Sequence, residues 1–421
     1  MPSHEILPIS SAPSPRLLAR SLAEEGEELV ALLESGPGYH ERSRYTIVAW
    51  GGEERVVEWG EDLRGELEDL RRSVGDGKIA IGYLSYEAAV SVEEILEEAL
   101  PRPDWPLAEF FEPEGFAMYD RALGKVRFVG ETPRARPLEE DPGFEVVERI
   151  GGTRIESFLD WVRGALSDIE RGEVLQVVLS RREDYTFRGC PMTLYERLAE
   201  LNPSPYMYAL RFGDRWILGT SPELLVKVEG GEVETHPIAG TRPRGKTPEE
   251  DLRLEEELVA SAKDRAEHVM LVDLARNDLG KVCRRGTVRV RGLYAVEKYQ
   301  SVQHLVSRVS GILEAGLTVV DALLATFPAG TVTGAPKVRA MELIASYERE
   351  PRGPYAGAVG FLYGGGGEFA ITIRSAFVRE SSIRIQAGAG IVYDSRPELE
   401  LAETEHKLES LKRAMGIWAS S

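Results

Sequence analysis

Two apolar runs, Gly357-Ala-Val-Gly-Phe-Leu-Tyr363 and Phe369-Ala-Ile-Thr-Ile-Arg374, flank four consecutive glycines near the end of the chain. Apolar runs joined by a glycine-rich turn are typical of an antiparallel β-hairpin. Further strands are expected at 44–50, 78–86, 174–180, 216–219, 224–228 and 383–387. Because hairpin signals rather than regular crossovers connect these segments, we expect an α+β fold or a layered α/β sandwich.

Helices are expected between these strands. A possible capping box, Thr153 with Glu156, opens an apolar periodicity that runs to residue 169. An acidic helical stretch is expected near 61–72, a long charged helix over 248–279, and a last helix over 397–418. Prolines, glycines and charges at 131–152 indicate the boundary between an N-terminal region, 1–140, and a main domain, 150–421.

Composition excludes several classes of protein. The 421 residues suffice for two to three domains, and the formal charge of -19 disfavours a general nucleic-acid surface. Two cysteines, Cys190 and Cys283, form neither a disulfide framework nor a thiolate zinc cluster. Because we find no signal peptide and no apolar run of about 18 residues, we expect a soluble cytoplasmic protein.

The stretch Gly240-Thr-Arg-Pro-Arg-Gly-Lys-Thr247 fits the phosphate-loop pattern G-x-x-x-x-G-K-T. Pro243 lacks an amide donor, and the acidic residues at 249–251 would repel a phosphate. We therefore interpret this stretch as an arginine-rich loop before a helix rather than as a nucleotide site.

Two predicted helices carry carboxylates on one face. Asp264 and Glu267 are three residues apart, and Glu400 and Glu403 repeat this spacing ahead of Lys407. Two such helices could hold one Mg²⁺ between them, with positions left for water and an anionic substrate. Spacing alone also allows the simpler interpretation, in which glutamate-rich helices present solvated faces.

Other polar residues stand in apolar surroundings. His304 lies in a strand-like run and is either a satisfied core histidine or a base. Arg374 is predicted to end a strand, as a carboxylate clamp or as an ordinary charge. Gly388-Ala389-Gly390 is expected to form a turn whose amides can hold an anion.

Long motifs in a fixed order carry a family resemblance. They are Ser221-Pro-Glu-Leu-Leu, Pro237-Ile-Ala-Gly-Thr-Arg-Pro-Arg244, Glu267-His-Val-Met-Leu-Val-Asp-Leu-Ala-Arg-Asn-Asp278, Thr331-Val-Thr-Gly-Ala-Pro-Lys337 and Glu403-Thr-Glu-His-Lys407. These motifs resemble the chorismate-utilising enzymes, most closely the synthase subunits of the anthranilate synthase branch, and are dense from about 172 to 418. The resemblance implies a large sandwich of two mainly antiparallel β-sheets with helices outside, into which the N-terminal region is interwoven.

The resemblance also implies a reaction. Chorismate binds with Mg²⁺, ammonia adds at C2, the C4 hydroxyl leaves, and pyruvate is eliminated to give anthranilate, the first step of tryptophan biosynthesis. Glu267 and Glu403 match the magnesium ligands, which Asp264 and Glu400 support. The catalytic set implied is Glu223 as proton donor to the hydroxyl, His304 in the elimination, Gln176 and Thr331.

Further positions match the substrate pocket of the family. Tyr355 and Arg374 resemble the clamp on the enolpyruvyl carboxylate, helped by the backbone at Gly388, Ala389 and Gly390. Gly240, Thr241 and Lys407 match other pocket residues.

Two residues distinguish branches of the family. Relatives that add water carry a lysine where Gln176 stands, and an amide is not a base. Aminodeoxychorismate synthases, which aminate C4 through an enzyme nucleophile, carry a lysine where Ala239 stands. Both positions favour amination at C2, and aminodeoxychorismate synthase component I is the alternative.

The resemblance implies partners as well. Neither cysteine resembles a glutaminase nucleophile, so ammonia is expected from a separate glutamine amidotransferase subunit, in a heterotetramer of two synthase and two amidotransferase chains. Tryptophan is expected as a feedback inhibitor. Its pocket would combine Leu33, Glu34 and Ser35 with Pro205, Tyr206 and Met207.

Overall fold

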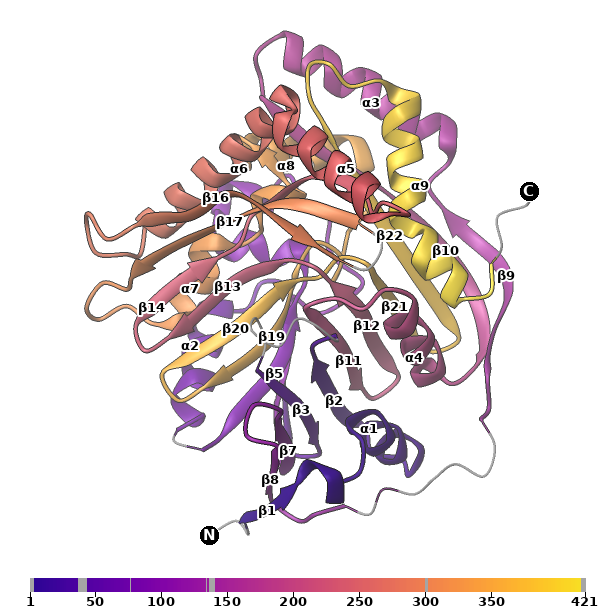
Figure 1. Cartoon of the computed structure of the whole chain (residues 1–421), viewed down its shortest axis with the longest axis vertical. Helices are drawn as coiled ribbons and strands as arrows, with labels where there is room; N and C mark the ends of the chain where they lie inside the picture. The colour runs from indigo at the N-terminus through magenta and orange to yellow at the C-terminus, as the bar shows by residue number, and fades with distance from the viewer. Residues whose placement is uncertain are drawn as a thin grey trace.

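Two large antiparallel β-sheets pack face to face, with helices on the outside (Figure 1). The computed structural model describes residues 4–36, 44–75, 77–133, 135, 141–299 and 302–417. Within these residues, twelve strands form one sheet and ten form the other. The predicted two-sheet sandwich is therefore confirmed.

The twelve-stranded sheet draws strands from both ends of the chain. Its order is β1 (His4–Pro8), β8 (Lys125–Val129), β7 (Gly115–Asp120), β3 (Tyr45–Trp50), β2 (Leu29–Glu34), β11 (Tyr206–Phe212), β12 (Arg215–Ser221), β21 (Ser375–Arg379), β22 (Ser382–Ile391), β10 (Gln176–Gly189) and β18 (Gly334–Ala335), with β9 (Phe144–Gly152) also paired to β10. Strand β2, from the N-terminal region, pairs with β11 from the main domain.

The ten-stranded sheet mixes the two regions in the same way. Its order is β15 (Ile238–Pro243), β17 (Val302–Ile312), β14 (Glu232–Thr235), β13 (Leu224–Glu229), β20 (Gly366–Ile371), β19 (Ala358–Tyr363), β5 (Ile79–Leu84), β6 (Ala108–Glu112) and β4 (Glu53–Val57), with β16 (Arg289–Lys298) also paired to β17. The hairpin expected around the four glycines is β19–β20, and β5 lies against β19.

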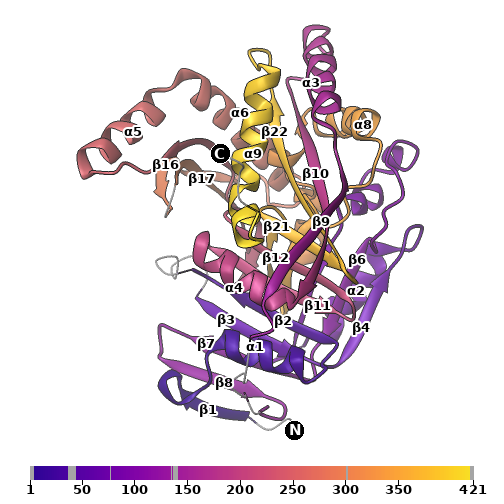
Figure 2. The ribbon, with the colours of Figure 1, turned by 90° about the vertical axis from the view of Figure 1, so that its right-hand side faces the viewer.

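Helices cover the outer faces. Those packed on the twelve-stranded sheet and on one another are α1 (Pro15–Glu24), α3 (Ile155–Glu170), α4 (Pro191–Leu201), α8 (Lys337–Glu348) and α9 (Pro397–Ala414). Those on the side of the ten-stranded sheet are α2 (Leu63–Ser73), α5 (Pro248–Ala260), α6 (Ala262–Gly280) and α7 (Val319–Thr326). Short 3₁₀ helices are η1 (Ile9–Ser11), η2 (Tyr86–Ser91), η3 (Glu94–Glu97) and η4 (Gly330–Val332). In Figure 2, α5 extends away from the body of the molecule.

The largest apolar cluster fills the space between the sheets. Large side chains from both sheets meet there, among them Tyr83, Phe110, Phe212 and Phe377. Rings such as Tyr83 and Phe212 meet edge to face, at 5.6 Å between centroids. Burial of this apolar surface is the main force that holds the two sheets together. None of the helices in the described part of the chain is long and apolar enough to cross a membrane.

The prediction of one long charged helix over 248–279 is wrong, because two helices occupy that stretch. Helix α5 ends at Ala260, and Ser261 adopts an extended conformation with φ -64° and ψ 110°. The Ser261 hydroxyl accepts a hydrogen bond from the Asp264 amide at 3.2 Å, so it caps α6.

Three other local predictions are also wrong. The capping box at Thr153 and Glu156 does not form: α3 begins at Ile155 without a side-chain cap, and the Thr153 hydroxyl accepts from the Arg182 amide. Residues 388–390 form no turn but continue β22 to Ile391. Strand β20 ends at Ile371, so Arg374 lies beyond it. The expected end of the last helix at Trp418, and residues 134 and 136–140 of the expected boundary, lie outside the described residues.

Candidate active site

Two neighbouring strand connections position Glu223 and Arg374. The chain passes from one sheet to the other between β12 and β13, and again between β20 and β21. Backbone hydrogen bonds join the connections: the Ile371 amide donates to the Glu223 carbonyl at 3.1 Å, and the Thr220 amide to the Arg374 carbonyl at 3.2 Å. The two crossings therefore bring Glu223 and Arg374 together.

Glu223 is a buried carboxyl group, 5 % exposed. Desolvation raises its pKa to about 8, while contacts with Thr331 and the Ile238 backbone, and the charges of Lys407 and Arg374, act in the opposite direction. The side chain therefore keeps its proton at neutral pH and can donate it. Glu223 and Thr331 also line a cavity of about 30 Å³ between α6, η4 and β13.

His304, on β17, faces the bulged end of β15. Its Nδ1 lies 2.9 Å from the Gly240 carbonyl oxygen and 3.0 Å from the Thr241 hydroxyl. A carbonyl can only accept, so Nδ1 carries the proton and Nε2 keeps the lone pair. Burial lowers the pKa of His304 to about 4, which leaves the imidazole neutral and able to accept a proton.

The carboxylates of α6 and α9 approach one another. Burial and the charge of Glu403 raise the pKa of Glu267, whose Oε1 accepts a hydrogen bond from Gln176 Nε2 at 3.2 Å. Lys407 pairs with Glu403 at 2.7 Å. Lys407 holds the pKa of Glu403 below its usual value, although burial acts in the opposite direction.

The two supporting carboxylates have partners of their own. Asp264 pairs with Arg242 at 2.8 Å, and Glu400 is buried beside Ser395. Among the described residues, no group of three or more His, Cys, Asp or Glu side chains is arranged as a metal cage. The chain therefore offers a pair of facing carboxylates, which fits an ion that takes its other oxygens from water and substrate.

Arg374 is a cation that has no ionic partner among the described residues. Within the described part of the chain, its guanidinium forms no ion pair or side-chain hydrogen bond, and burial lowers its pKa. Its backbone has a positive φ of 54°. Residues near enough to act on its charge are Tyr355, Glu403 and Glu223. Unused donors of this kind are suited to a carboxylate.

The glycines of β22 leave room for these groups. A Cβ atom on Gly388 would lie 3.0 Å from the Tyr355 hydroxyl oxygen, and one on Gly390 would lie 2.5 Å from Gln176 Nε2. The carbonyl of Gly388 accepts from Lys407 Nζ at 2.8 Å. Ala389 points to the opposite face, into the apolar cluster below α3 and α8, so only its backbone belongs to this site.

A second cavity lies between the sheets, apart from this site. Its volume is about 290 Å³. The predicted inhibitor residues Leu33, Glu34, Tyr206 and Met207 line it together with Arg44, Tyr45, Ile47, Tyr208, Lys227, Glu229, Val359, Gly360, Phe361, Glu368 and Ala370. Ser35 and Pro205 are not among the lining residues, but the Ser35 hydroxyl donates to the Pro205 carbonyl at 2.7 Å and ties the two segments together.

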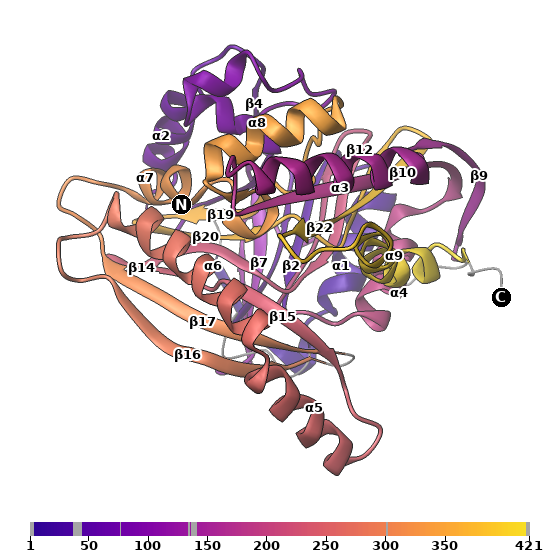
Figure 3. The ribbon, with the colours of Figure 1, turned by 90° about the horizontal axis from the view of Figure 1, so that it is seen from above.

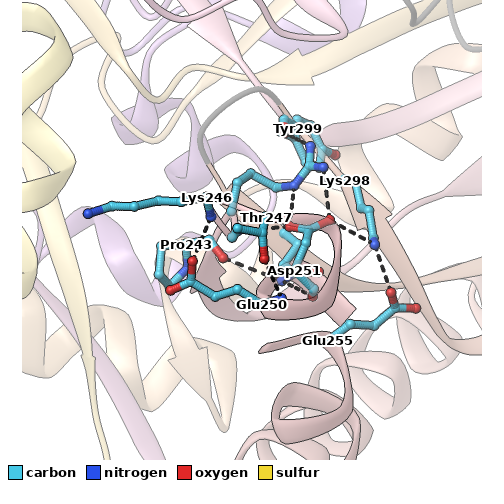
Figure 4. Close-up of polar contacts among 11 residues, drawn as sticks. Pro243, Lys246, Thr247, Glu250, Asp251, Glu255, Lys298 and Tyr299 are labelled. Atoms are coloured by element: carbon cyan, nitrogen blue, oxygen red, sulfur yellow. Dashed lines mark hydrogen bonds and ion pairs between the residues drawn. The ribbon is translucent and has the colours of Figure 1, made fainter. Parts of the chain in front are cut away.

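In the stretch that matches the phosphate-loop pattern, backbone amides are bonded to side chains of the following helix, α5 (Figure 4). The amide of Gly245 donates to Asp251 at 2.9 Å, and that of Lys246 donates to Glu250 at 2.8 Å. Carboxylates from the first turn of α5 thus take the amides that would cradle a phosphate. The rejection of a nucleotide site agrees with this geometry.

The sequence interpretation missed a buried arginine behind the site. Arg352 donates to the carbonyls of Val332 and Val178, each at 2.8 Å, and pairs with Glu348 at 2.7 Å. Its guanidinium also lies over the ring of Tyr355, at 5.7 Å. The only sequence signal is Pro351-Arg-Gly-Pro354, which indicates a turn but not a buried charge.

Comparisons with known proteins show what the chain is similar to. The family profile described as chorismate binding enzyme matches residues 30–413. Anthranilate synthase component 1 of Aeropyrum pernix is 49% identical, covering 97% of this chain and 95% of that protein. The protein of the same name from Saccharolobus solfataricus is 46% identical, covering 98% and 100%. The crystal structure of anthranilate synthase component I from Streptococcus pneumoniae superposes with a TM-score of 0.80 at 34% identity, covering 90% and 93%.

Proposed function

The chain belongs to the family of chorismate binding enzymes, and on this premise we propose that it is the synthase component of an anthranilate synthase. It would aminate chorismate at C2 with ammonia and then eliminate pyruvate. The near-full-length similarity to relatives named anthranilate synthase component 1 supports this proposal.

One observation supports the choice of ammonia as nucleophile: a buried glutamine, Gln176, lies beside the carboxylate of Glu267. Gln176 is 3 % exposed, its Nε2 donates to Glu267, and its Oε1 has no hydrogen-bond partner among the described residues. That oxygen is an acceptor for an N–H group and cannot activate water as a base. Ala239, buried beside Gly240, offers no nucleophile for amination at C4.

Glu223 and His304 divide the proton transfers. Neutral Glu223 protonates the departing C4 hydroxyl, so that water leaves as ammonia adds at C2. His304 accepts at Nε2 the ring proton that is lost as the enolpyruvyl group departs and the ring becomes aromatic. The bond to the Gly240 carbonyl keeps the imidazole in the tautomer that this step needs.

Positive groups bind the two carboxylates of chorismate. Arg374, whose donors are unused within the described ranges, and Tyr355 clamp the enolpyruvyl carboxylate beside Gly388. Glu267 and Glu403 would hold Mg²⁺, supported by Asp264 and Glu400. Bound Mg²⁺ supplies Lewis-acid polarisation of the ring carboxylate. The pKa of Glu267 is raised by burial and by the charge of Glu403, and this supports the assignment because a cation would offset the repulsion between the two carboxylates.

Ammonia comes from a separate glutamine amidotransferase chain in this proposal. Burial raises the pKa of both described cysteines, that of Cys283 to about 11, so neither is a ready thiolate. A glutaminase needs a cysteine of lowered pKa with a base beside it. We further propose a two-plus-two heterotetramer and a cytoplasmic location.

In this proposal, tryptophan acts as a feedback inhibitor by binding in the cavity between the sheets. Its volume of about 290 Å³ is at the lower end for a small-ligand site. Aromatic and apolar side chains would receive the indole, while Glu368 offers an acceptor for the amino group; the Glu34 carboxylate is engaged by Arg16 and Tyr195. This combination of surfaces suits an aromatic amino acid.

The deciding experiment incubates the chain with chorismate, Mg²⁺ and ammonium at mildly alkaline pH and follows anthranilate fluorescence. We expect anthranilate without the amidotransferase partner. Accumulation of aminodeoxychorismate instead would overturn the argument from Ala239 and favour aminodeoxychorismate synthase component I.

A further inference from the structure

Asp251, in the first turn of α5, gathers four donors on one carboxylate (Figure 4). Arg244 donates to it through Nε at 2.7 Å and Nη2 at 2.9 Å. The Gly245 amide donates at 2.9 Å and Lys298 Nζ at 3.0 Å. Arg244, followed by this amide and by Lys298, holds the pKa of Asp251 well below its usual range, so the carboxylate stays ionised.

These contacts tie three segments into one unit, which we call the Asp251 hub: Arg244 and Gly245 after β15, Asp251 on α5, and Lys298 with Tyr299 at the end of β16. Arg244 Nη1 donates to the Tyr299 carbonyl at 2.8 Å. Lys298 also pairs with Glu255 on α5 at 2.8 Å. In the view of Figure 3, α5 extends from the rest of the molecule beside β15, so the hub fastens a peripheral helix to this strand end.

The hub lies directly beside the end of β15, where Gly240 and Thr241 contact His304 of β17. Strands β15 and β17 pair Pro243 with Val302 and Thr241 with His304, so only two residues separate the hub from Thr241. The ring of Tyr299, whose carbonyl belongs to the hub, packs against His304 edge to face at 5.3 Å.

The Gly240 carbonyl, which fixes the His304 tautomer, lies at an irregular point in the pairing of β15 with β17. The pairing of β15 with β17 shifts between Ala239 and Thr241, and the residue that the shift leaves out, Gly240, has a φ of +63°. Because Gly240 has no regular partner in the ladder, the direction of its carbonyl depends on how the strand is anchored on either side. On the C-terminal side the strand is anchored by Arg242, which pairs with Asp264 at 2.8 Å, and then by the Asp251 hub.

We propose that Asp251 is a positioning residue for the reaction: through Arg244 and Tyr299 it holds the end of β15 and the His304 ring so that Gly240 fixes the imidazole tautomer. This inference rests on the proposed function. Asp251 itself lies outside the group of side chains assigned to chorismate. Its effect should therefore appear in turnover rather than in substrate affinity.

The test compares Asp251→Asn with Glu255→Gln in the ammonia-dependent formation of anthranilate by the full chain. Asparagine keeps the size of the side chain but brings an amide donor against the donors of the hub. We expect kcat to fall on the order of 10–100-fold with the chorismate KM changed less than about threefold, because small misplacements of a catalytic group have effects of this size. Glu255→Gln removes one ion pair of the hub and should stay close to wild type.

A double-mutant cycle separates positioning from a general structural effect. In a His304→Ala background, Asp251→Asn should cause no further loss of kcat beyond about twofold, because the group it positions is gone. An equal loss in both backgrounds, or a rise in KM alone, would overturn the proposal.

A second readout does not need turnover. In protein labelled with ¹⁵N-histidine, the His304 signals should report a single tautomer protonated at Nδ1, which becomes averaged in Asp251→Asn but not in Glu255→Gln. Unchanged His304 signals in Asp251→Asn would contradict the proposal. If the wild-type chain forms no anthranilate, the proposed function fails while these spectra still decide the role of Asp251.

Discussion

At the scale of single residues, the site depends on groups whose protonation the fold has set. Glu223 is buried and His304 is half-buried, and desolvation shifts their pKa values in opposite directions: it keeps the acid protonated and the base neutral. Between about pH 4 and pH 8, one group can therefore donate a proton while the other can accept one. The surroundings of the two side chains in the protein thus shift their pKa values apart, so that one group serves as acid and the other as base at the same pH.

Glu223→Gln should remove the proton donor for the departing hydroxyl. We expect the rate of chorismate consumption to fall about 10²–10⁴-fold, the range for loss of a general acid. With free ammonia held constant, wild-type kcat/KM should decline as pH rises through about 8, where Glu223 loses its proton. The residual activity of Glu223→Gln should lack this decline, and a decline that persists in the variant would assign it to another group.

Glu403→Gln should abolish turnover and weaken magnesium binding while leaving the fold intact. The side chain is partly exposed and its described ion pair is with Lys407, so the helix does not depend on it. Calorimetric titration with Mg²⁺ gives a readout besides activity. Glu409→Gln on the same helix, which alters an exposed pair with Arg413, is the matched control. Retained Mg²⁺ affinity in Glu403→Gln would remove the metal assignment.

At the scale of elements, the break between α5 and α6 shows where a sequence pattern misleads. The charged stretch over 248–279 has continuous helical composition, so it predicts one helix. The signal against this was present in Ser261-Ala-Lys-Asp264, because serine three residues before an acidic residue is typical of a helix start. Separating the helices lets α5 extend outward while α6 carries Glu267 toward α9.

Ser261→Ala should destabilise the protein by about 1 kcal/mol, the usual effect of removing a helix N-cap. The hydroxyl satisfies the Asp264 amide, which has no partner within the first turn of α6. The midpoint of urea unfolding measures this loss. Ser261→Thr keeps a capping hydroxyl and should recover most of the stability; equal losses in both variants would show that the cap is not the cause.

Strand β22 illustrates a second limit of sequence interpretation. Glycines at 388 and 390 predict a turn, because glycine usually marks one. In the structure they lie in a regular strand, and they are small because Tyr355 and Gln176 approach them closely. A glycine that admits a neighbouring side chain has the same signature as one that allows a turn, and only the tertiary neighbours distinguish the two.

At the scale of the whole molecule, the sandwich and the catalytic motifs were predictable from the chain, whereas the supports behind them were not. Periodicity and hairpin signals are local and indicated an α+β fold or a layered α/β sandwich, while the resemblance to the family implied the two antiparallel sheets. The contacts of Arg352 are with carbonyls and carboxylates at Glu87, Val178, Val332 and Glu348, and its own amide donates to Glu87 at 2.7 Å. Because the partners of Arg352 come from distant segments of the chain, no periodic pattern in the sequence predicts these contacts.

The cavity between the sheets lends itself to a test of regulation, since it lies apart from the residues assigned to chorismate. The Ser35 hydroxyl ties β2 to the segment before β11, and Ser35 is 2 % exposed. Ser35→Phe has no room for its ring without displacing Pro205 and the neighbouring Met207. It should therefore blunt inhibition by tryptophan without greatly raising the chorismate KM.

Binding can be followed without catalysis, because a ligand held between two sheets stabilises the folded chain according to its concentration relative to Kd. Tryptophan should raise the melting temperature of the wild-type chain in a concentration-dependent manner, less so that of Ser35→Phe. Ser35→Ala, which removes the hydroxyl but adds no bulk, should retain most of the response. If Ser35→Phe shows the same thermal shift and the same inhibition curve as wild type, tryptophan acts at another place and the cavity has a different occupant.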